Sequence, residues 1–435
     1  MEGKPFAEVV AEVVSDAMDR VLPTPIARDT QIRALPGKID AVLGMRRSGK
    51  TWLLFDHAAR LVADGLPRDR ILYLNFEDER LMPMQAADLH LVLDAFLARF
   101  PEHAGQECWL LFDEIQNVPG WDRWLRRLID RGGLRIAVTG SSAKLLGTEI
   151  ATALRGRSLP TELLPYSFAE ALRHEGVALP KRWPPPEATR ALLKNRFRRF
   201  LDVGGFPEVQ GLDEPTRRRV LQDYVDVALL RDVIERHGVG NPGALRWLVR
   251  RLLGSPGGAF TVNKAYGDLR SQGHTIAKDT VHAYVAWLED AFLFLPVEAE
   301  AASERARAVR PRKIYAVDHA LAGVTSVEGG GIGHRLENIV YVELRRRGYQ
   351  VRYVPTPHGY EVDFLAVRGD ERRLVQVCAD LGGEAFAREL RAIEDALPAL
   401  GMDHAEIVTL EDDRVREVEG GRVTMTSAWR WLLAP

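Results

Sequence analysis

The stretch GMRRSGKT at residues 44–51 decides the fold of the first part of the chain. It follows the apolar run IDAVL at residues 39–43, and a helical pattern begins at Thr51. Its glycines let the backbone turn sharply, so that several N–H groups and the first turn of the helix face one point. A buried strand, a glycine-rich turn and a helix in this order predict the first βα unit of a parallel sheet.

This turn has the composition of a site for the phosphates of ATP together with Mg²⁺. The Lys50 ammonium would reach the β- and γ-phosphate oxygens, and the Thr51 hydroxyl would hold Mg²⁺. The alternative is a glycine-rich turn without chemical function, which the flanking strand and helix argue against. The expected nucleotide-binding residues are Gly44, Arg47, Ser48, Gly49, Lys50, Thr51 and Trp52.

A second nucleotide motif is the run WLLFDE at residues 109–114, an apolar strand that ends in two carboxylates. We expect Asp113 to complete the Mg²⁺ shell and Glu114 to accept a proton from the attacking water. An acid directly after the magnesium ligand favours a hydrolase over a protein that only binds nucleotide. The alternative is a pair of solvated carboxylates at the end of a strand.

Two further features are candidates for the catalytic site. The strand LRIAVTG ends near Thr139, whose hydroxyl could orient water beside the γ-phosphate, unless this segment is only a turn that caps the next helix. Arg155 and Arg157 follow it, and either guanidinium could stabilise the γ-phosphate of a neighbouring subunit in the transition state. Ordinary surface arginines remain the alternative for both.

Composition limits the class of protein. The 435 residues argue for two to four domains, and 46% hydrophobic residues allow each domain a buried core. The chain has 59 Lys+Arg and 61 Asp+Glu, so any contact with DNA must be a local basic patch. Two cysteines, no apolar run of 18 residues and no signal-peptide pattern lead us to expect a cytoplasmic protein without a membrane partner.

The order of patterns predicts an α/β multidomain protein. Apolar runs alternate with helical patterns as far as about residue 165, which is typical of a parallel sheet covered by helices. Three short helices and a strand hairpin, the winged-helix arrangement, follow between residues 241 and 298. The expected domains are a P-loop ATPase core at residues 1–170, a helical lid at 171–240, a winged helix at 241–325 and a carboxy-terminal α/β domain at 326–435.

A basic cluster lies where the wing of the winged helix is expected. Each phosphate that such a cluster neutralises releases counterions, so these side chains are candidate DNA contacts. The alternative is a packing module whose arginines pair with carboxylates. The cluster consists of Arg305, Arg307, Arg310, Arg312 and Lys313.

Several of these segments together resemble a known family, the bacterial and archaeal AAA-type ATPases that carry a carboxy-terminal domain of unknown function. The resemblance implies an ATPase core, a winged helix and a nuclease-like end. It covers nearly the whole chain and rests on the segments GMRRSGKT, LLFDEIQNVPGW, VTGSS, LRGRSLPTELLPYSF, GGFPE at 204–208, LLRDV at 229–233, KIYAVD at 313–318, VDF and QVC.

The carboxy-terminal segment resembles the PD-(D/E)XK nuclease fold. Glu361 and Asp363 point to one face of a strand, and with Glu337 and Gln376 they could bind a divalent metal. Cys378 stands where active members place a lysine, and no lysine follows Lys313. From the sequence we therefore expect a degenerate nuclease site that contacts DNA or partners without cutting.

These patterns lead to one functional hypothesis and its rivals. We expect a Mg²⁺-dependent ATP hydrolase that acts on forked, junction or double-stranded DNA as a homo-oligomer, with a hexamer as one candidate. An ATP-dependent nuclease is one rival. A nucleotide-switched signalling or defence regulator with a protein partner is the other.

Overall fold

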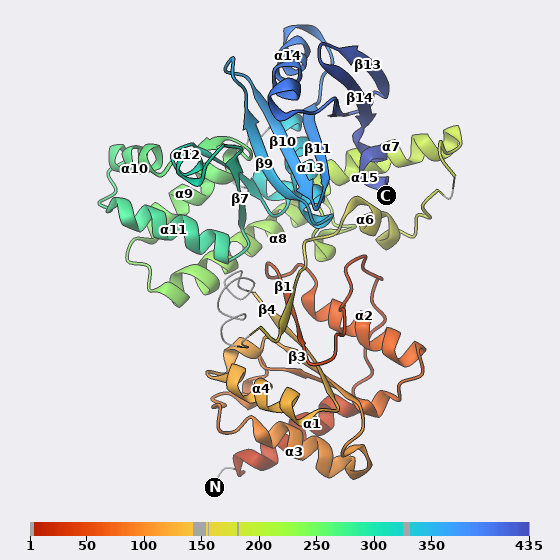
Figure 1. Cartoon of the computed structure of the whole chain (residues 1–435). Helices are drawn as coiled ribbons and strands as arrows, with labels where there is room; N and C mark the ends of the chain where they lie inside the picture. Colours follow the sequence, from red (N-terminus) through yellow and green to blue (C-terminus); the bar gives the residue numbers. More distant parts are fainter. Residues whose placement is uncertain (1–3, 142–153, 155, 181, 325–330, 435) are drawn as a thin grey trace. The chain divides into compact units, whose positions relative to one another are not determined.

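The computed structural model describes residues 4–141, 154, 156–180, 182–324 and 331–434. They belong to two compact units, Met1–Leu163 and Leu164–Pro435 (Figure 1). This division is coarser than the four domains expected from the sequence. The finer boundaries at residues 240 and 325 therefore stay predictions.

The first unit contains a five-stranded parallel sheet of order β2-β3-β4-β1-β5. Every residue of β1 and β3 is buried, as expected for strands covered on both faces. Strand β4 lies between β1 and β3, so the carboxyl ends of these three strands meet at one edge. Its elements are α1 Phe6–Asp19, β1 Ile39–Leu43, α2 Lys50–Ala63, β2 Ile71–Asn75, α3 His90–Arg99, β3 Cys108–Asp113, α4 Trp121–Arg131, β4 Leu134–Gly140 and β5 Ser158–Glu162.

Helix α1 has no counterpart in the sequence-based expectations. It packs against α3 and β2 and buries Val10, Val13 and Val14. On α2, Leu53, Leu54 and Phe55 lie in the same buried cluster as sheet residues of β1, β3 and β4. The strand with the phosphate motif and the helix that follows it are thus held together by a close-packed apolar layer.

The second unit begins with helices. These are α6 Phe168–His174, α7 Glu187–Val203, α8 Glu214–Val227 and a π-helix at Ala228–Glu235, which contains the LLRDV segment. Four more helices and three strands follow, with β8 paired antiparallel to both β6 and β7. They are α9 Pro242–Gly254, β6 Ala259–Phe260, α10 Val262–Ser271, α11 Lys278–Asp290, β7 Phe294–Ala299, α12 Glu304–Ala308 and β8 Arg312–Ala316.

The carboxy-terminal segment continues the same sheet. Strand β9 pairs parallel with β7, through Glu298 opposite Arg352 and Ala299 opposite Tyr353. The result is a nine-stranded sheet of order β13-β14-β12-β11-β10-β9-β7-β8-β6. The added elements are α13 Ile332–Arg346, β9 Gln350–Pro355, β10 Glu361–Arg368, β11 Glu371–Cys378, α14 Gly383–Leu400, β12 His404–Thr409, β13 Arg414–Val418, β14 Gly421–Ser427 and α15 Ala428–Leu433.

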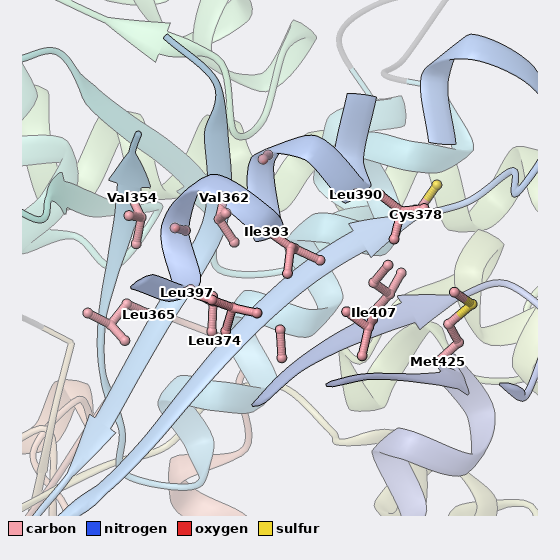
Figure 2. Close-up of a cluster of buried hydrophobic side chains, with 14 residues drawn as sticks. Val354, Val362, Leu365, Leu374, Cys378, Leu390, Ile393, Leu397, Ile407 and Met425 are labelled. Carbon is pink, nitrogen blue, oxygen red and sulfur yellow. The ribbon is translucent and has the colours of Figure 1, made fainter. Parts of the chain in front are cut away.

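Helix α14 covers one face of this sheet (Figure 2). Its residues Ile393 and Leu397 are fully buried against strand residues that include Val362, Leu374 and Ile407. The helix carries its apolar side chains on one stripe, and the strands supply theirs from alternate positions. This apolar layer fixes the positions of β10 and β11, which carry three of the polar residues singled out in the sequence.

The segments GGFPE and KIYAVD, far apart in the sequence, contact each other in this unit. The Gly205 N–H donates to Asp318 Oδ2 at 2.6 Å. A Cβ at position 204, where φ is +80°, would lie 2.3 Å from Asp318 Oδ1. The first glycine is therefore required by the close approach of the Asp318 carboxylate as well as by its backbone conformation.

Candidate functional site

The phosphate loop has the backbone geometry that its glycines predict. Gly49 caps the amino end of α2 with φ 100° and ψ 25°, a left-handed conformation that favours glycine. At Gly44 a Cβ would lie 2.3 Å from the Leu163 carbonyl oxygen. Arg28, which the sequence did not single out, is buried and donates to the Ser48 carbonyl at 3.0 Å. The backbone near Leu163 thus packs closely against the start of the loop, and Arg28 holds its later part through a hydrogen bond.

Lys50 lies buried at the first turn of α2. Its Nζ is 3.2 Å from the Gly44 carbonyl oxygen and 3.4 Å from that of Met45, so its ammonium lies within the loop. It also lies 3.4 Å from Oε1 of Glu114, which is at the end of β3. The two residues expected to act on the phosphates and on the attacking water are therefore neighbours.

Asp113 is the centre of a group of hydroxyl donors. The Thr51 hydroxyl donates to its Oδ2 at 2.6 Å, the Tyr73 hydroxyl donates to the same oxygen at 2.9 Å, and the Thr139 hydroxyl donates to Oδ1. Burial raises the pKa of Asp113 above its ordinary value, because no cationic side chain offsets it in this hydrogen-bond set. A cation placed here would lower that pKa again.

Glu114 is held directly beside this group. Its backbone N–H donates to the Thr139 hydroxyl oxygen at 2.9 Å, and its φ of 52° turns the chain at the end of β3. The Gln116 amide donates to its Oε2. Thr139 therefore joins Asp113 and Glu114, a role more definite than the water-orienting role expected from the sequence.

The residues at this edge fit ATP with Mg²⁺. Hydroxyl and carboxylate oxygens of Thr51 and Asp113 are the hard donors that Mg²⁺ prefers. The Ser48 hydroxyl is buried and has no hydrogen-bond partner within the described part of the chain, which suits a donor to a phosphate oxygen.

The other residues predicted for the nucleotide site lie away from the group around Asp113, and one of them lies outside the described residues. Trp52 is 49% exposed on α2, and Arg47 adopts a left-handed φ of 67° in the loop. Arg157 pairs with Asp130 at the end of α4 and helps to line a cavity of about 600 Å³. Arg155 lies outside the described residues.

Tyr73 was missed because a tyrosine in an apolar strand is ordinarily a core residue. Its hydroxyl reaches Asp113 because β2 and β3 pair in parallel, with Asn75 opposite Asp113. The sequence could have indicated this contact, because the strands that carry Tyr73 and Asp113 are adjacent in the chain and end at the same edge of the sheet. Gln116 could have been noticed from its spacing of two residues from Glu114.

The structure also brings together the four polar residues predicted in the carboxy-terminal segment. Asp363 donates its N–H to Gln376 Oε1 at 2.9 Å, and its Oδ2 accepts from the Val377 N–H at 3.0 Å. Burial and the charge of Asp363 raise the pKa of Glu337 to about 7. With Glu361, these residues line a cavity of about 530 Å³.

Lys313 requires a correction of the sequence argument. We expected it on an exposed wing, and we expected no lysine to reach the carboxylates. Instead it is 6% exposed, and its Nζ lies within 3.2 Å of Glu337, Glu361 and Asp363. The reason is that β8 belongs to the same sheet as β10, across the predicted domain boundary.

The four arginines of the expected wing are less buried than Lys313. Arg305, Arg310 and Arg312 are exposed, and Arg305 and Arg307 lie on the short helix α12 between β7 and β8. Arg307 lies 4.0 Å from Glu298, and Arg312 lies 3.7 Å from Glu289. These pairs are long, so they neutralise the cluster only in part.

Cys378 is a buried thiol. Burial is the main cause that raises the pKa of the Cys378 thiol to about 11, so the thiol is protonated at neutral pH and is not a nucleophile.

Among the described residues, no helix is both long and apolar enough to cross a membrane.

Comparisons with known proteins extend over most of the chain. Residues 36–172 match the family described as an AAA domain, and residues 194–328 match a domain of unknown function, DUF8612. An uncharacterized protein of Methanocaldococcus jannaschii is 33% identical over 419 residues, which cover 94% of this chain and 91% of the relative. An uncharacterized protein of Haemophilus influenzae is 32% identical over 345 residues, which cover 79% and 83%. Among solved structures, a Walker-type ATPase of Pyrococcus abyssi is 15% identical with a TM-score of 0.45, covering 71% of this chain and 99% of the other.

The position of Lys50 leads to a binding prediction. Replacing Lys50 by Ala removes the ammonium from the loop, so we expect ATP to bind about 10- to 100-fold more weakly, the value of a hydrogen bond to a charged group. Binding of a fluorescent ATP analogue measures this. The control is Lys4→Ala, whose ammonium pairs with Glu12 on exposed α1. Equal affinity of the Lys50→Ala and Lys4→Ala proteins would contradict the assignment.

Proposed function

Because the chain belongs to the family of AAA-domain proteins that includes the Methanocaldococcus and Haemophilus relatives, we propose that it is a Mg²⁺-dependent ATP hydrolase. Its turnover is coupled to the binding or remodelling of DNA by an oligomer. Residues 36–172 form the AAA-type P-loop ATPase domain. The observation that carries the proposal is the convergence of Lys50, Glu114 and Asp113 at the ends of neighbouring parallel strands.

In this mechanism the loop N–H groups and the Lys50 ammonium hold the β- and γ-phosphates of ATP. When bound, Mg²⁺ supplies positive charge beside the transferred phosphoryl group, and Thr51 and Asp113 would hold it. Glu114 accepts the proton of the attacking water at its carboxylate. Its Oε1 lies 3.4 Å from Lys50 Nζ, so the ammonium that would hold the phosphates is also in reach of the base.

Thr139 has a positioning role in the proposed site. Its hydroxyl donates to Asp113 and accepts from the Glu114 N–H, which fixes the turn that presents the Glu114 side chain. The base and the magnesium ligand are thereby held in one orientation by a single side chain. Such prior ordering lowers the reorganisation needed during hydrolysis.

A substitution at Glu114 tests the hydrolysis step. The Glu114→Gln protein keeps the shape of the side chain but removes the base, so we expect ATP to bind as in the unmodified chain while turnover falls at least about 100-fold. Phosphate release under single-turnover conditions measures this. Glu102→Gln, on an exposed turn before β3, serves as the control. Undiminished turnover in Glu114→Gln would refute the role of this residue. Slow release of intact nucleotide by the unmodified chain would favour a signalling switch.

We further propose that an arginine acts across subunits. Arg155 or Arg157 of one subunit would approach the γ-phosphate bound by the next, and the pairing of Arg157 with Asp130 would be exchanged for that contact. A mixture of Lys50→Ala and Arg157→Ala chains, or of Lys50→Ala and Arg155→Ala chains, would then recover part of the lost turnover. The control mixture of Lys50→Ala with Glu114→Gln recovers none. Each of these substitutions inactivates the nucleotide site of its own chain, so neither chain can repair the other. Turnover that is independent of protein concentration in every mixture would show that the arginine acts within one subunit or not at all.

DNA binding is proposed for the segment from α9 to β8. The helices α9, α10 and α11, together with strands β6, β8 and β7 paired antiparallel in that order at one end of the sheet, support its description as a winged helix. The exposed arginines of the β7–β8 connection suit phosphate contacts. With α11 outside this basic cluster, binding rests on the connection and not on a strongly charged recognition helix.

Salt dependence of DNA binding tests this segment. Replacing Arg305, Arg310 and Arg312 by Ala should weaken binding at least about 10-fold and lower the slope of log affinity against log salt concentration by about 2 to 3. Fluorescence anisotropy with labelled forked and duplex DNA measures both quantities. A matched triple substitution of exposed arginines on β13 and β14 (Arg414, Arg416 and Arg422) should leave the slope unchanged. Equal slopes for the two triple variants would move the DNA contact elsewhere.

A further inference from the structure

Lys313 lies at the point where three carboxylates converge. Its Nζ is 2.8 Å from Glu361 Oε1, 3.1 Å from Asp363 Oδ1 and 3.2 Å from Glu337 Oε1. The carboxylates come from β10 and α13, whereas the lysine comes from β8. These distances are those of ion pairs, and three carboxylates around one amine favour its charged form. The ammonium is therefore charged in the folded protein.

A divalent metal, which the resemblance to nucleases implies, does not fit this arrangement. A metal would need the same three oxygens at about 2.0 to 2.6 Å from one centre. That centre is the space which Lys313 Nζ occupies. The other oxygen of Asp363 is already engaged by the Val377 N–H. Among the described residues, no group of three or more His, Cys, Asp or Glu side chains is arranged to hold a metal ion.

Further contacts hold the carboxylates around the ammonium. The Tyr315 hydroxyl donates to Glu337 Oε1 at 2.6 Å, and Tyr315 lies two residues after Lys313 on the same strand. Residues i and i+2 of a strand share a face, so β8 supplies two donors to this cluster. At Gly257 a Cβ would lie 2.8 Å from Glu337 Oε1. The segment before β6 thus leaves room for the glutamate in this position.

The charge balance of the cluster makes a cation necessary. Two carboxylates with little exposure, those of Glu337 and Asp363, and the 44% exposed carboxylate of Glu361 meet one ammonium. Lys313 is the cation that the described part of the chain places in contact with these carboxylates, so removing it leaves their charges uncompensated, which is strongly unfavourable. A divalent cation drawn from solution would then be the simplest replacement, and the adjoining cavity of about 530 Å³ gives it access.

We propose that Lys313 is the built-in cation of this pocket: its ammonium takes the place of a divalent metal, and its removal creates a divalent-cation site formed by Glu337, Glu361 and Asp363. The proposal does not depend on ATP hydrolysis. It replaces the sequence argument against DNA cleavage, which rested on the absence of a lysine. In this proposal cleavage is prevented because the position of the Lys313 ammonium, and not the absence of a lysine, keeps out the metal that cleavage would need.

Metal binding by the full chain tests the proposal. Mn²⁺ affinity is measured without nucleotide by the paramagnetic resonance signal of free Mn²⁺. Lys313→Met keeps a side chain of similar length without charge, so Mn²⁺ should bind at least about 10-fold more tightly than to the unmodified chain. Lys264→Met, at an exposed lysine on α10, is the matched control and should leave the affinity unchanged. Adding Asp363→Asn to Lys313→Met should abolish the gain.

Three results would overturn the proposal. One is that the unmodified chain binds Mn²⁺ as tightly as Lys313→Met, since the metal would then bind beside the lysine. Another is cleavage of DNA by the unmodified chain with Mg²⁺ or Mn²⁺ that disappears in Asp363→Ala. The third is a folded Lys313→Met protein that gains no Mn²⁺ affinity.

The proposal can also be tested if the Lys313→Met protein does not fold. In that case Mn²⁺ should restore the thermal unfolding transition, because the metal supplies the missing charge, whereas the same ionic strength of NaCl should not. The charge-conserving Lys313→Arg protein should fold and show no gain in Mn²⁺ affinity. Failure of Mn²⁺ to restore the folding of Lys313→Met would contradict the proposal.

Discussion

The nucleotide edge of the first unit depends on the buried carboxylate of Asp113. Three hydroxyls, from the start of α2, from β2 and from β4, donate to its two oxygens. These donors come from elements that are far apart in the sequence, and only the parallel order of the sheet brings them to one place. The apolar layer beneath α2 and the glycine turn are the conditions under which these four side chains can meet.

The two units offset their buried carboxylates in opposite ways. In the first unit neutral hydroxyls surround Asp113, so the charge is solvated by dipoles and full compensation waits for a cation from outside. In the second unit the ammonium of Lys313 is already in contact with Glu337, Glu361 and Asp363. One arrangement is built to receive a cofactor, and the other is complete without one. In the proposals above, this difference separates a site of turnover from a site whose role is structural or in recognition.

Local signals in the sequence predicted much of this structure. The three short helices expected between residues 241 and 298 are α9, α10 and α11, and an N-cap threonine and a glycine turn delimit α10. The loop at residues 44–51 and the carboxylates at the end of β3 could be identified because their chemistry is carried by contiguous residues. Helix α1 was missed, since its partners α3 and β2 follow it by more than 50 residues.

Non-local pairing explains why the position of Lys313 was predicted wrongly. Strands β7 and β9 pair through only two residue pairs, and nothing in either segment marks the other as its neighbour. Without that pairing, the segment from α9 to β8 and the segment from α13 onward looked like separate domains. The position of Lys313 follows from the joined sheet, so it could not be inferred from the spacing of residues within one segment.

The pairing of β7 with β9 also limits how this chain can be divided during evolution or in the laboratory. The match to DUF8612 ends at residue 328, between β8 and α13, although the sheet continues across that point. A fragment that begins there would expose the backbone edge of β9 to pairing with other molecules, as unprotected edge strands do. It would also leave three acidic side chains without Lys313. The two segments therefore form one structural module, and separating them would leave both an open strand edge and three carboxylates without their lysine.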